Sequence, residues 1–118
     1  VELVGFQQNP FPFMKQASVF VLASEYEGTS NVLIQALALG TPVVATDCPG
    51  GSREILDDGQ FGTLVPVGDP ESLASGIVQA IKTPLRHIEA AGAIAARYGV
   101  QTATDGYLAA AGLSTAAP

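Results

Sequence analysis

The chain has little of several residue types, and each shortage disfavours a class of protein. Cys48 is its only cysteine, so no internal disulfide can form and a reducing compartment is expected. His87 is the only histidine, which disfavours a zinc site built from Cys and His. Lys and Arg number 5 against 11 Asp and Glu, a formal net charge of −6. That balance disfavours binding to nucleic acid or to an anionic membrane, since both need a basic surface.

Long apolar runs are also lacking. Residues 19–23 and 32–39 form the longest ones, and both are too short or too interrupted to cross a bilayer. No basic segment followed by an apolar run opens the chain, so no signal segment or membrane span is expected. Gly-Lys-Ser/Thr and Gly-x-Ser-x-Gly are both absent, which removes the motif evidence for a P-loop or a serine hydrolase.

The sequence has what a small globular domain needs. Of its 118 residues, 47% are hydrophobic, and 13 Gly and 8 Pro supply many turns. A chain of this length is expected to form one domain that buries roughly two-thirds of its unfolded surface.

The stretch 24–51 is the most informative part of the chain. Asn31 or Ser30 can cap a helix whose apolar residues recur at helical spacing, and Gly40 is expected to end it. Residues 42–45 then read as a buried strand that enters a loop of Thr46, Asp47, Cys48, Pro49, Gly50 and Gly51. A polar loop also precedes the helix, after the apolar run at 19–23, so polar loops follow two successive predicted strands. Ligands of parallel sheets bind at the edge formed by the carboxyl ends of the strands.

Strands and helices alternate along the rest of the chain. Strands are expected at 2–6, at 18–23, buried on both faces, and at 61–65. Short helices are expected at 11–17, begun by Asn9 and Pro10, and at 52–56, capped by Ser52. A longer helix begins at Asp69 and Pro70, ends at Pro84, and covers the sheet through Leu73, Ala74, Ile77, Ala80 and Ile81. Two Ala-rich helices divided near Tyr98 and Gly99 follow over 85–113, and residues 114–118 are expected to fray. The predicted fold is α/β: a Rossmann-like parallel sheet of about four strands with helices on both faces.

The same residues resemble the signature of retaining GT-B glycosyltransferases of the group 1, or family 4, type. Glu27-Gly28 and Gly40-Thr41-Pro42-Val43-Val44 match that signature, whereas Gln35 stands where the family has a second acid. The likeness runs from about residue 1 to residue 83, through 46–56 and 62–69. Several linked matches in the right order are far more specific than any one of them.

The resemblance implies a function for a longer protein. That protein would transfer a sugar from a nucleotide diphosphate sugar to a hydroxyl acceptor with retention, without a metal or other cofactor. Residues 1–113 would be part of the carboxyl-terminal, donor-binding Rossmann-like domain, a fragment that is inactive alone. Its partners would be the nucleotide sugar and an amino-terminal domain of the same protein, in the cytoplasm or at the inner face of a membrane through that domain. No nucleic acid is expected as a partner.

The resemblance also assigns roles to individual residues. Glu27 would contact the hydroxyls of the transferred sugar and is the catalytic candidate. The start of the following helix would hold the diphosphate, because unpaired N–H groups there bind anions without side-chain charge. Gln35 would contact the ribose hydroxyls of the nucleotide, and Gly5 and Phe6 would contact its base. The donor-binding candidates are thus Gly28, Thr29, Ser30, Asn31, Val32, Gln35, Gly5 and Phe6.

Each of these residues also has a simpler explanation. Glu27 could be an exposed acid before a helix, as Glu25 is expected to be, Gln35 a half-buried helix residue, and Phe6 core. Asp47, Ser52, Arg53 and Glu54 are expected to be mainly structural. The chain as a whole could be a non-catalytic nucleotide-sugar or interaction module, or an α/β structural domain that self-associates through an open sheet edge.

Overall fold

The computed structural model describes residues 1–83 and 86–113, so the expected stop at Pro84 and the expected frayed tail at 114–118 lie outside the described residues. Its elements, in chain order, are α1 (Phe11–Gln16), β1 (Phe20–Leu22), α2 (Asn31–Ala38), β2 (Val43–Thr46), α3 (Ser52–Ile55), β3 (Thr63–Val65), α4 (Pro70–Lys82), α5 (Arg86–Tyr98) and α6 (Val100–Ala110). Strands alternate with helices as far as α4, as predicted.

The sheet is parallel, with strand order β1-β2-β3. Phe20 lies opposite Val43 in the first pair of strands, and Val44 lies opposite Thr63 in the second. Every residue of β2 is buried, whereas every residue of β1 is only partly buried. The expectation of a β1 buried on both faces was therefore wrong, because β1 lies at an edge of the sheet among the described residues.

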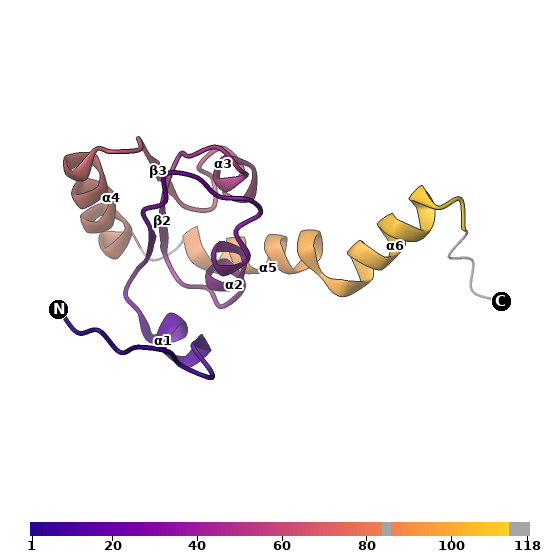
Figure 1. Cartoon of the computed structure of the whole chain (residues 1–118), viewed down its shortest axis with the longest axis horizontal. Coiled ribbons are helices and arrows are strands. Elements are labelled where there is room, and N and C mark those ends of the chain that lie inside the picture. The colour runs from indigo at the N-terminus through magenta and orange to yellow at the C-terminus, as the bar shows by residue number, and fades with distance from the viewer. Residues whose placement is uncertain (84–85, 114–118) are drawn as a thin grey trace.

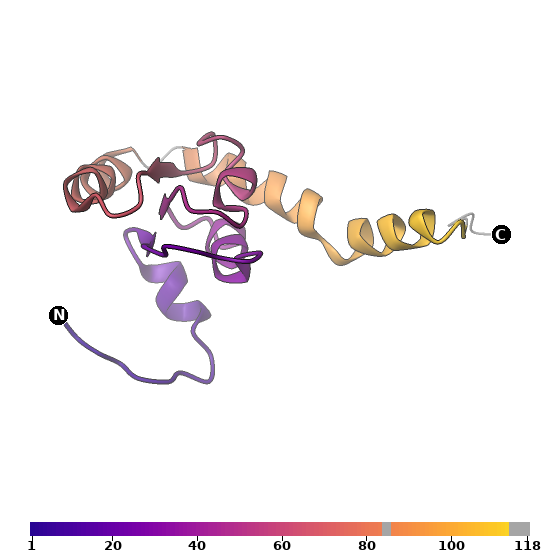
Figure 2. The ribbon, with the colours of Figure 1, turned by 45° about the horizontal axis from the view of Figure 1, so that its top comes forward.

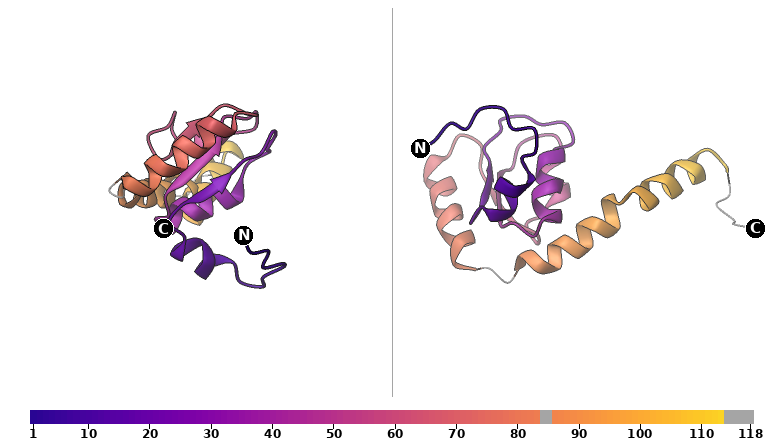
Figure 3. Two further views of the ribbon diagram at one scale, coloured as in Figure 1. Left: turned by 90° about the vertical axis from the view of Figure 1, so that its left-hand side faces the viewer. Right: turned by 90° about the horizontal axis from the view of Figure 1, so that it is seen from below.

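Helices cover both faces of this sheet (Figure 1). On one face α2, α3 and α5 enclose the larger core, which includes Leu33, Leu37, Ile55 and Ile94. On the other face α4 packs over Val44 and Val65. Figure 2 and both views of Figure 3 show the same layers, with α4 on one side of the strands and α2 on the other. The predicted fold class is confirmed, with three strands in place of about four.

Residues 1–10 do not form the strand predicted at 2–6. A strand needs a hydrogen-bonded neighbour, and no described residue pairs with this segment in the sheet. The segment lies next to α1, near the amino ends of the strands (Figures 1 and 2). The helix after it is present as predicted, but Pro10, not Asn9, occupies the cap position. The Asn9 side chain accepts a hydrogen bond from the Phe11 N–H, and Thr41 Oγ1 donates to the Met14 carbonyl at 2.8 Å.

The helix α4 begins as predicted, with Asp69 at the cap and Pro70 in the first turn. Its buried face matches the predicted one in part. Leu73, Ile77 and Ala80 pack on the sheet as predicted, whereas Ala74 and Ile81 are exposed. The helix approaches the sheet closely at the buried Gly76: a Cβ there would lie 3.2 Å from side-chain atoms of Val44, Thr63 and Val65.

The last two helices differ in their contacts, because α5 packs in the larger core and α6 leaves the body of the domain. They divide near Tyr98 and Gly99 as predicted, and none of the α6 residues is buried. Figure 1 shows α6 projecting away from the sheet. No helix in the ranges 1–83 and 86–113 is long and apolar enough to span a membrane.

Candidate functional site

The loops that follow β1 and β2 meet at the carboxyl ends of the strands. The backbone N–H of Glu27, in the first loop, donates to the carbonyl of Pro49, in the second, at 3.1 Å. The two loops are in contact because the strands that lead into them, β1 and β2, are neighbours in the sheet. The juxtaposition predicted from two successive strand-to-loop junctions is present.

Glu27 is half-buried, and its carboxylate is held in place. Ser24 Oγ donates to Glu27 Oε1 at 2.6 Å. Thr46, the last residue of β2, donates its hydroxyl to the carbonyl of Ser24 and lies 3.3 Å from that of Leu22. Glu25 is exposed, as expected for a solvated acid. The two neighbouring acids therefore have different environments, and Glu27 is the one that the fold orients.

Gly50 allows the second loop to lie against the first. Its φ is +111°, and a Cβ at this position would overlap the carbonyl oxygen of Glu27 and lie 3.1 Å from that of Gly28. Any side chain at residue 50 would push the loops apart. Gly50 is therefore a contact residue through its backbone alone.

The start of α2 lies directly after this junction. Helical residues begin at Asn31, so the cap position is Ser30 and the proposed capping role of Asn31 was wrong. The Ser30 side chain makes no capping hydrogen bond. Its hydroxyl is buried and has no hydrogen-bond partner among the residues that the structure describes. A buried hydroxyl without a partner is costly, and it lies at a helix end whose first N–H groups have no acceptor within the helix.

The other predicted donor-binding residues divide into two groups. Gly28, Thr29 and Asn31 are exposed around the start of α2, Val32 is 42% exposed, and Gln35 is half-buried one turn further along the helix. All five lie in the segment that directly follows Glu27, at or near the start of α2. Gly5 and Phe6 are not brought there: they lie in the segment next to α1, and Phe6 is 94% exposed, so neither the predicted strand end nor a core role for Phe6 is observed.

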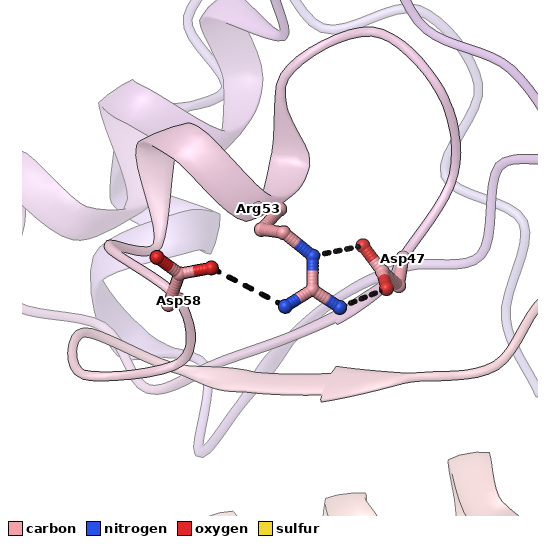
Figure 4. Close-up of polar contacts among 3 residues, drawn as sticks. All are labelled: Asp47, Arg53 and Asp58. Atoms are coloured by element: carbon pink, nitrogen blue, oxygen red, sulfur yellow. Dashed lines mark hydrogen bonds and ion pairs between the residues drawn. The ribbon is translucent and has the colours of Figure 1, made fainter.

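Arg53 braces the second loop. Figure 4 shows its guanidinium between Asp47, which it contacts through two nitrogens, and Asp58, at 3.3 Å. Hydrogen bonds to Asp47 and then Asp58 raise the pKa of Arg53 above its usual value. Arg97 donates to a carboxylate oxygen of Glu54 at 2.9 Å and to its backbone carbonyl. The structural role expected of this group fits these contacts, since both guanidinium groups already have acidic partners.

Four contact residues of the site were missed from the sequence: Ser24, Thr46, Pro49 and Gly50. Ser24 and Thr46 could have been predicted as neighbours, because each directly follows a predicted strand and so lies at the same edge of the sheet. Pro49 and Gly50 act through backbone atoms, which residue type does not reveal.

Relatives with known names were found for most of the chain. The model of the family "Glycosyl transferases group 1" matches residues 1–83. A 4-alpha-N-acetylgalactosaminyltransferase of Campylobacter jejuni that acts on an undecaprenol diphosphate is 44% identical over 77 residues, 65% of this chain and 21% of that protein. The lipopolysaccharide core biosynthesis glycosyltransferase LpsE of Rhizobium meliloti is 37% identical over 81 residues, 69% of this chain and 24% of that protein.

Solved structures show the same fold. Anabaena HepE, crystallised with UDP, superposes with a TM-score of 0.76 at 24% identity, over 85% of this chain and 29% of that one. Sucrose-phosphate synthase of Thermosynechococcus elongatus gives a TM-score of 0.59 at 30% identity, over 82% of this chain and 27% of that one. The chain thus spans about a fifth to a quarter of the length of the named relatives. With its α/β fold and the match over residues 1–83, the chain belongs to the group 1 glycosyltransferase family.

Proposed function

We propose that this chain is the donor-binding part of a retaining glycosyltransferase, which moves a hexose-type sugar from a nucleotide diphosphate sugar to a hydroxyl acceptor. The observation that carries the proposal is the placement of Glu27. Ser24 orients its carboxylate in the loop that leads directly into α2, whose cap residue is Ser30.

In this proposal Glu27 binds the sugar. Ser24 occupies Oε1, so Oε2 is the oxygen that accepts hydrogen bonds from sugar hydroxyls. A carboxylate suits this task because it accepts several hydrogen bonds in a fixed geometry. The half-buried position of Glu27 supports the role, since such a site strengthens hydrogen bonds to a charged acceptor relative to open solvent.

The diphosphate lies at the start of α2. Backbone N–H groups of Gly28, Thr29, Ser30, Asn31 and Val32 are its donors, and the helix dipole favours the negative charge. Because Arg53 and Arg97 are paired with acids, the positive charge that clamps the diphosphate comes from another part of the longer protein. Gln35, one turn along α2, contacts the ribose.

The chemistry then follows from positioning and electrostatics. The bond between the anomeric carbon and the diphosphate oxygen breaks. A bond from the same carbon to the acceptor oxygen forms on the same face, and the departing diphosphate oxygen takes the acceptor's proton. No metal ion takes part. The acceptor binds mostly to an amino-terminal domain of the longer protein, which works in the cytoplasm, and the isolated chain binds donor without turnover.

The test is a titration of the purified chain followed by protein-observed NMR, with the amides of residues 24–35, 50 and 51 assigned. UDP-glucose is the first probe, because HepE was crystallised with UDP, and GDP-mannose is the second. We expect shifts confined to these amides, even with millimolar affinity, and a loss of the sugar-dependent shifts in Glu27→Gln. Glu25→Gln, an exposed neighbour, is the control. Shifts elsewhere, or the same loss in both variants, would contradict the proposal.

A second candidate is a non-catalytic nucleotide-sugar-binding module. Gln35 favours it, because an amide replaces the carboxylate that the family signature has at this position. A transfer assay on the longer protein separates the two, since a module binds donor but forms no product.

A further inference from the structure

We propose that Pro49, Gly50 and Ser24 form a clamp that positions Glu27, and that sugar recognition depends on this clamp while recognition of the nucleotide does not. The inference rests on the proposed function, because it takes Glu27 as the residue that meets the sugar. It assigns a positioning role to Ser24, in the loop that carries Glu27, and to Pro49 and Gly50, in the neighbouring loop.

The first contact of the clamp is with the backbone of Glu27. Its N–H donates to the Pro49 carbonyl at 3.1 Å, and its carbonyl oxygen lies where a side chain of residue 50 would be. The second loop therefore lies against the backbone on both sides of the Glu27 Cα. Displacement of either loop would move the carboxylate along with the backbone.

The second contact is with the carboxylate. Ser24 Oγ donates to Oε1 at 2.6 Å, and the Ser24 carbonyl accepts from the hydroxyl of Thr46. Thr46 is 5% exposed and belongs to β2, so it does not move with the loop that follows β1. The side chain of Glu27 is thereby fixed relative to the sheet.

The loop that carries Pro49 and Gly50 is anchored on both sides of these residues. On the amino-terminal side, the Asp47 N–H donates to the Val65 carbonyl at 2.8 Å, and Arg53 holds the Asp47 carboxylate (Figure 4). On the carboxyl-terminal side, the Gly51 carbonyl accepts from the Ile55 N–H at 2.8 Å, in the first turn of α3. The second loop is thus tied to β3 on one side and to α3 on the other, which makes it rigid enough to position a neighbour.

The test compares two clamp variants with matched controls in the purified chain. Gly50→Ala is paired with Gly68→Ala: both glycines have a positive φ, +111° and +74°, but only Gly50 has another residue where the new Cβ would lie. Ser24→Ala is paired with Ser75→Ala, an exposed serine of α4. Two properties are measured: hydrogen exchange of the Glu27 amide in the free chain, and the dissociation constants for UDP and UDP-glucose.

We expect Gly50→Ala to speed exchange of the Glu27 amide about fivefold or more, as loss of one hydrogen bond predicts, with Gly68→Ala unchanged at that amide. Both Gly50→Ala and Ser24→Ala should weaken binding of UDP-glucose about three- to tenfold and leave UDP within about twofold of the wild type. Ser24→Ala should leave exchange of the Glu27 amide unchanged, because it removes only the carboxylate contact.

The outcomes separate the clamp from the function on which it rests. If Gly50→Ala leaves the Glu27 amide protected, the clamp is wrong whatever the nucleotide data show. If both variants weaken UDP and UDP-glucose equally, the residues are merely structural and the positioning role is wrong. If the wild type binds neither nucleotide sugar nor nucleotide while Gly50→Ala still exposes the Glu27 amide, the proposed function fails and the role in sugar recognition fails with it.

Discussion

Gln35 carries an amide where the family signature has a carboxylate, and one substitution at this position would introduce the negative charge of the signature residue. In Gln35→Glu the added carboxylate should accept hydrogen bonds from ribose hydroxyls, and charged hydrogen bonds are about twice as strong as neutral ones. We expect UDP to bind more tightly by about 1 kcal/mol in calorimetry or NMR titration. Gln79→Glu, on the exposed surface of α4, adds the same charge away from the site. Unchanged or weaker binding in Gln35→Glu alone would end the ribose assignment.

Gly76 is the residue through which α4 approaches the sheet. A methyl group there meets three β-branched side chains at 3.2 Å, and overpacking of this kind costs about 1–3 kcal/mol. Gly92, in α5, has nothing within 4 Å of the same added atom, so Gly92→Ala gains helix propensity of about 0.5–1 kcal/mol. We expect Gly76→Ala to lower, and Gly92→Ala to raise, the free energy of unfolding in urea. A Gly76→Ala chain as stable as Gly92→Ala would show that α4 shifts freely.

At the scale of elements, the start of α4 should be sensitive to acid. The hydroxyl and the N–H of Ser72 donate to the Asp69 carboxylate and lower its pKa from 3.8. A group whose folded pKa is lowered contributes stability that is fully present above its unfolded pKa and is lost as the pH falls through the folded one. We expect the stability from this cap to be present above about pH 4 and to decrease below it.

Asp69→Asn isolates this effect, because Asn caps helices about as well but does not titrate. Its urea midpoint below pH 4 should fall less steeply than that of the wild type. Asp105→Asn, in the exposed helix α6, is the control. Identical acid slopes for the wild type and Asp69→Asn would contradict the role of the cap.

The sequence predicted the elements whose causes are local. Asp69 followed by Pro70 placed the start of α4, and Gly40, with φ +75°, ended α2 as expected. Elements that depend on a distant partner were predicted less well. The apolar residues at 2–6 do not form a strand in the described chain, because a strand needs a paired neighbour in the sheet and a local apolar pattern does not show whether one is present. The face of α4 was predicted at Leu73, Ile77 and Ala80 but not at Gly76, which adds nothing to a hydrophobic pattern.

The candidate site was likewise predictable where local sequence determines it, and not where it depends on contacts between distant segments. The sheet edge, Glu27 and the start of α2 followed from the order of strand, loop and helix. The sequence left the cap open between Asn31 and Ser30, because the two residue types have similar preferences and the choice depends on where the backbone turns. The contacts of Pro49 and Gly50 with Glu27 are made by backbone atoms, so no residue pattern could indicate them.

For the whole molecule, α6 adds length without adding to the core. The radius of gyration is 16.0 Å, against about 13–14 Å for a compact domain of this size, and the longest axis measures 54 Å. Since no residue of α6 is buried, removal of residues 100–118 should change the free energy of unfolding by no more than about 0.5 kcal/mol.

Ile94→Ala is the comparison for that deletion. Ile94 is fully buried in α5, so its truncation should cost about 2–5 kcal/mol in the same urea titration. A deletion as costly as Ile94→Ala would mean that α6 stabilises the domain through contacts that burial does not reveal.

The backbone contact between the two loops also bears on how such a protein diversifies. Because main-chain atoms make the contact between the loops and Ser24 holds the carboxylate, the exposed side chains of Glu25, Tyr26 and Thr29 carry no part of either contact. Mutations can accumulate at these positions while the acid that they surround keeps its orientation. Natural variation and laboratory libraries can therefore alter what approaches Glu27 without rebuilding the loop that presents it.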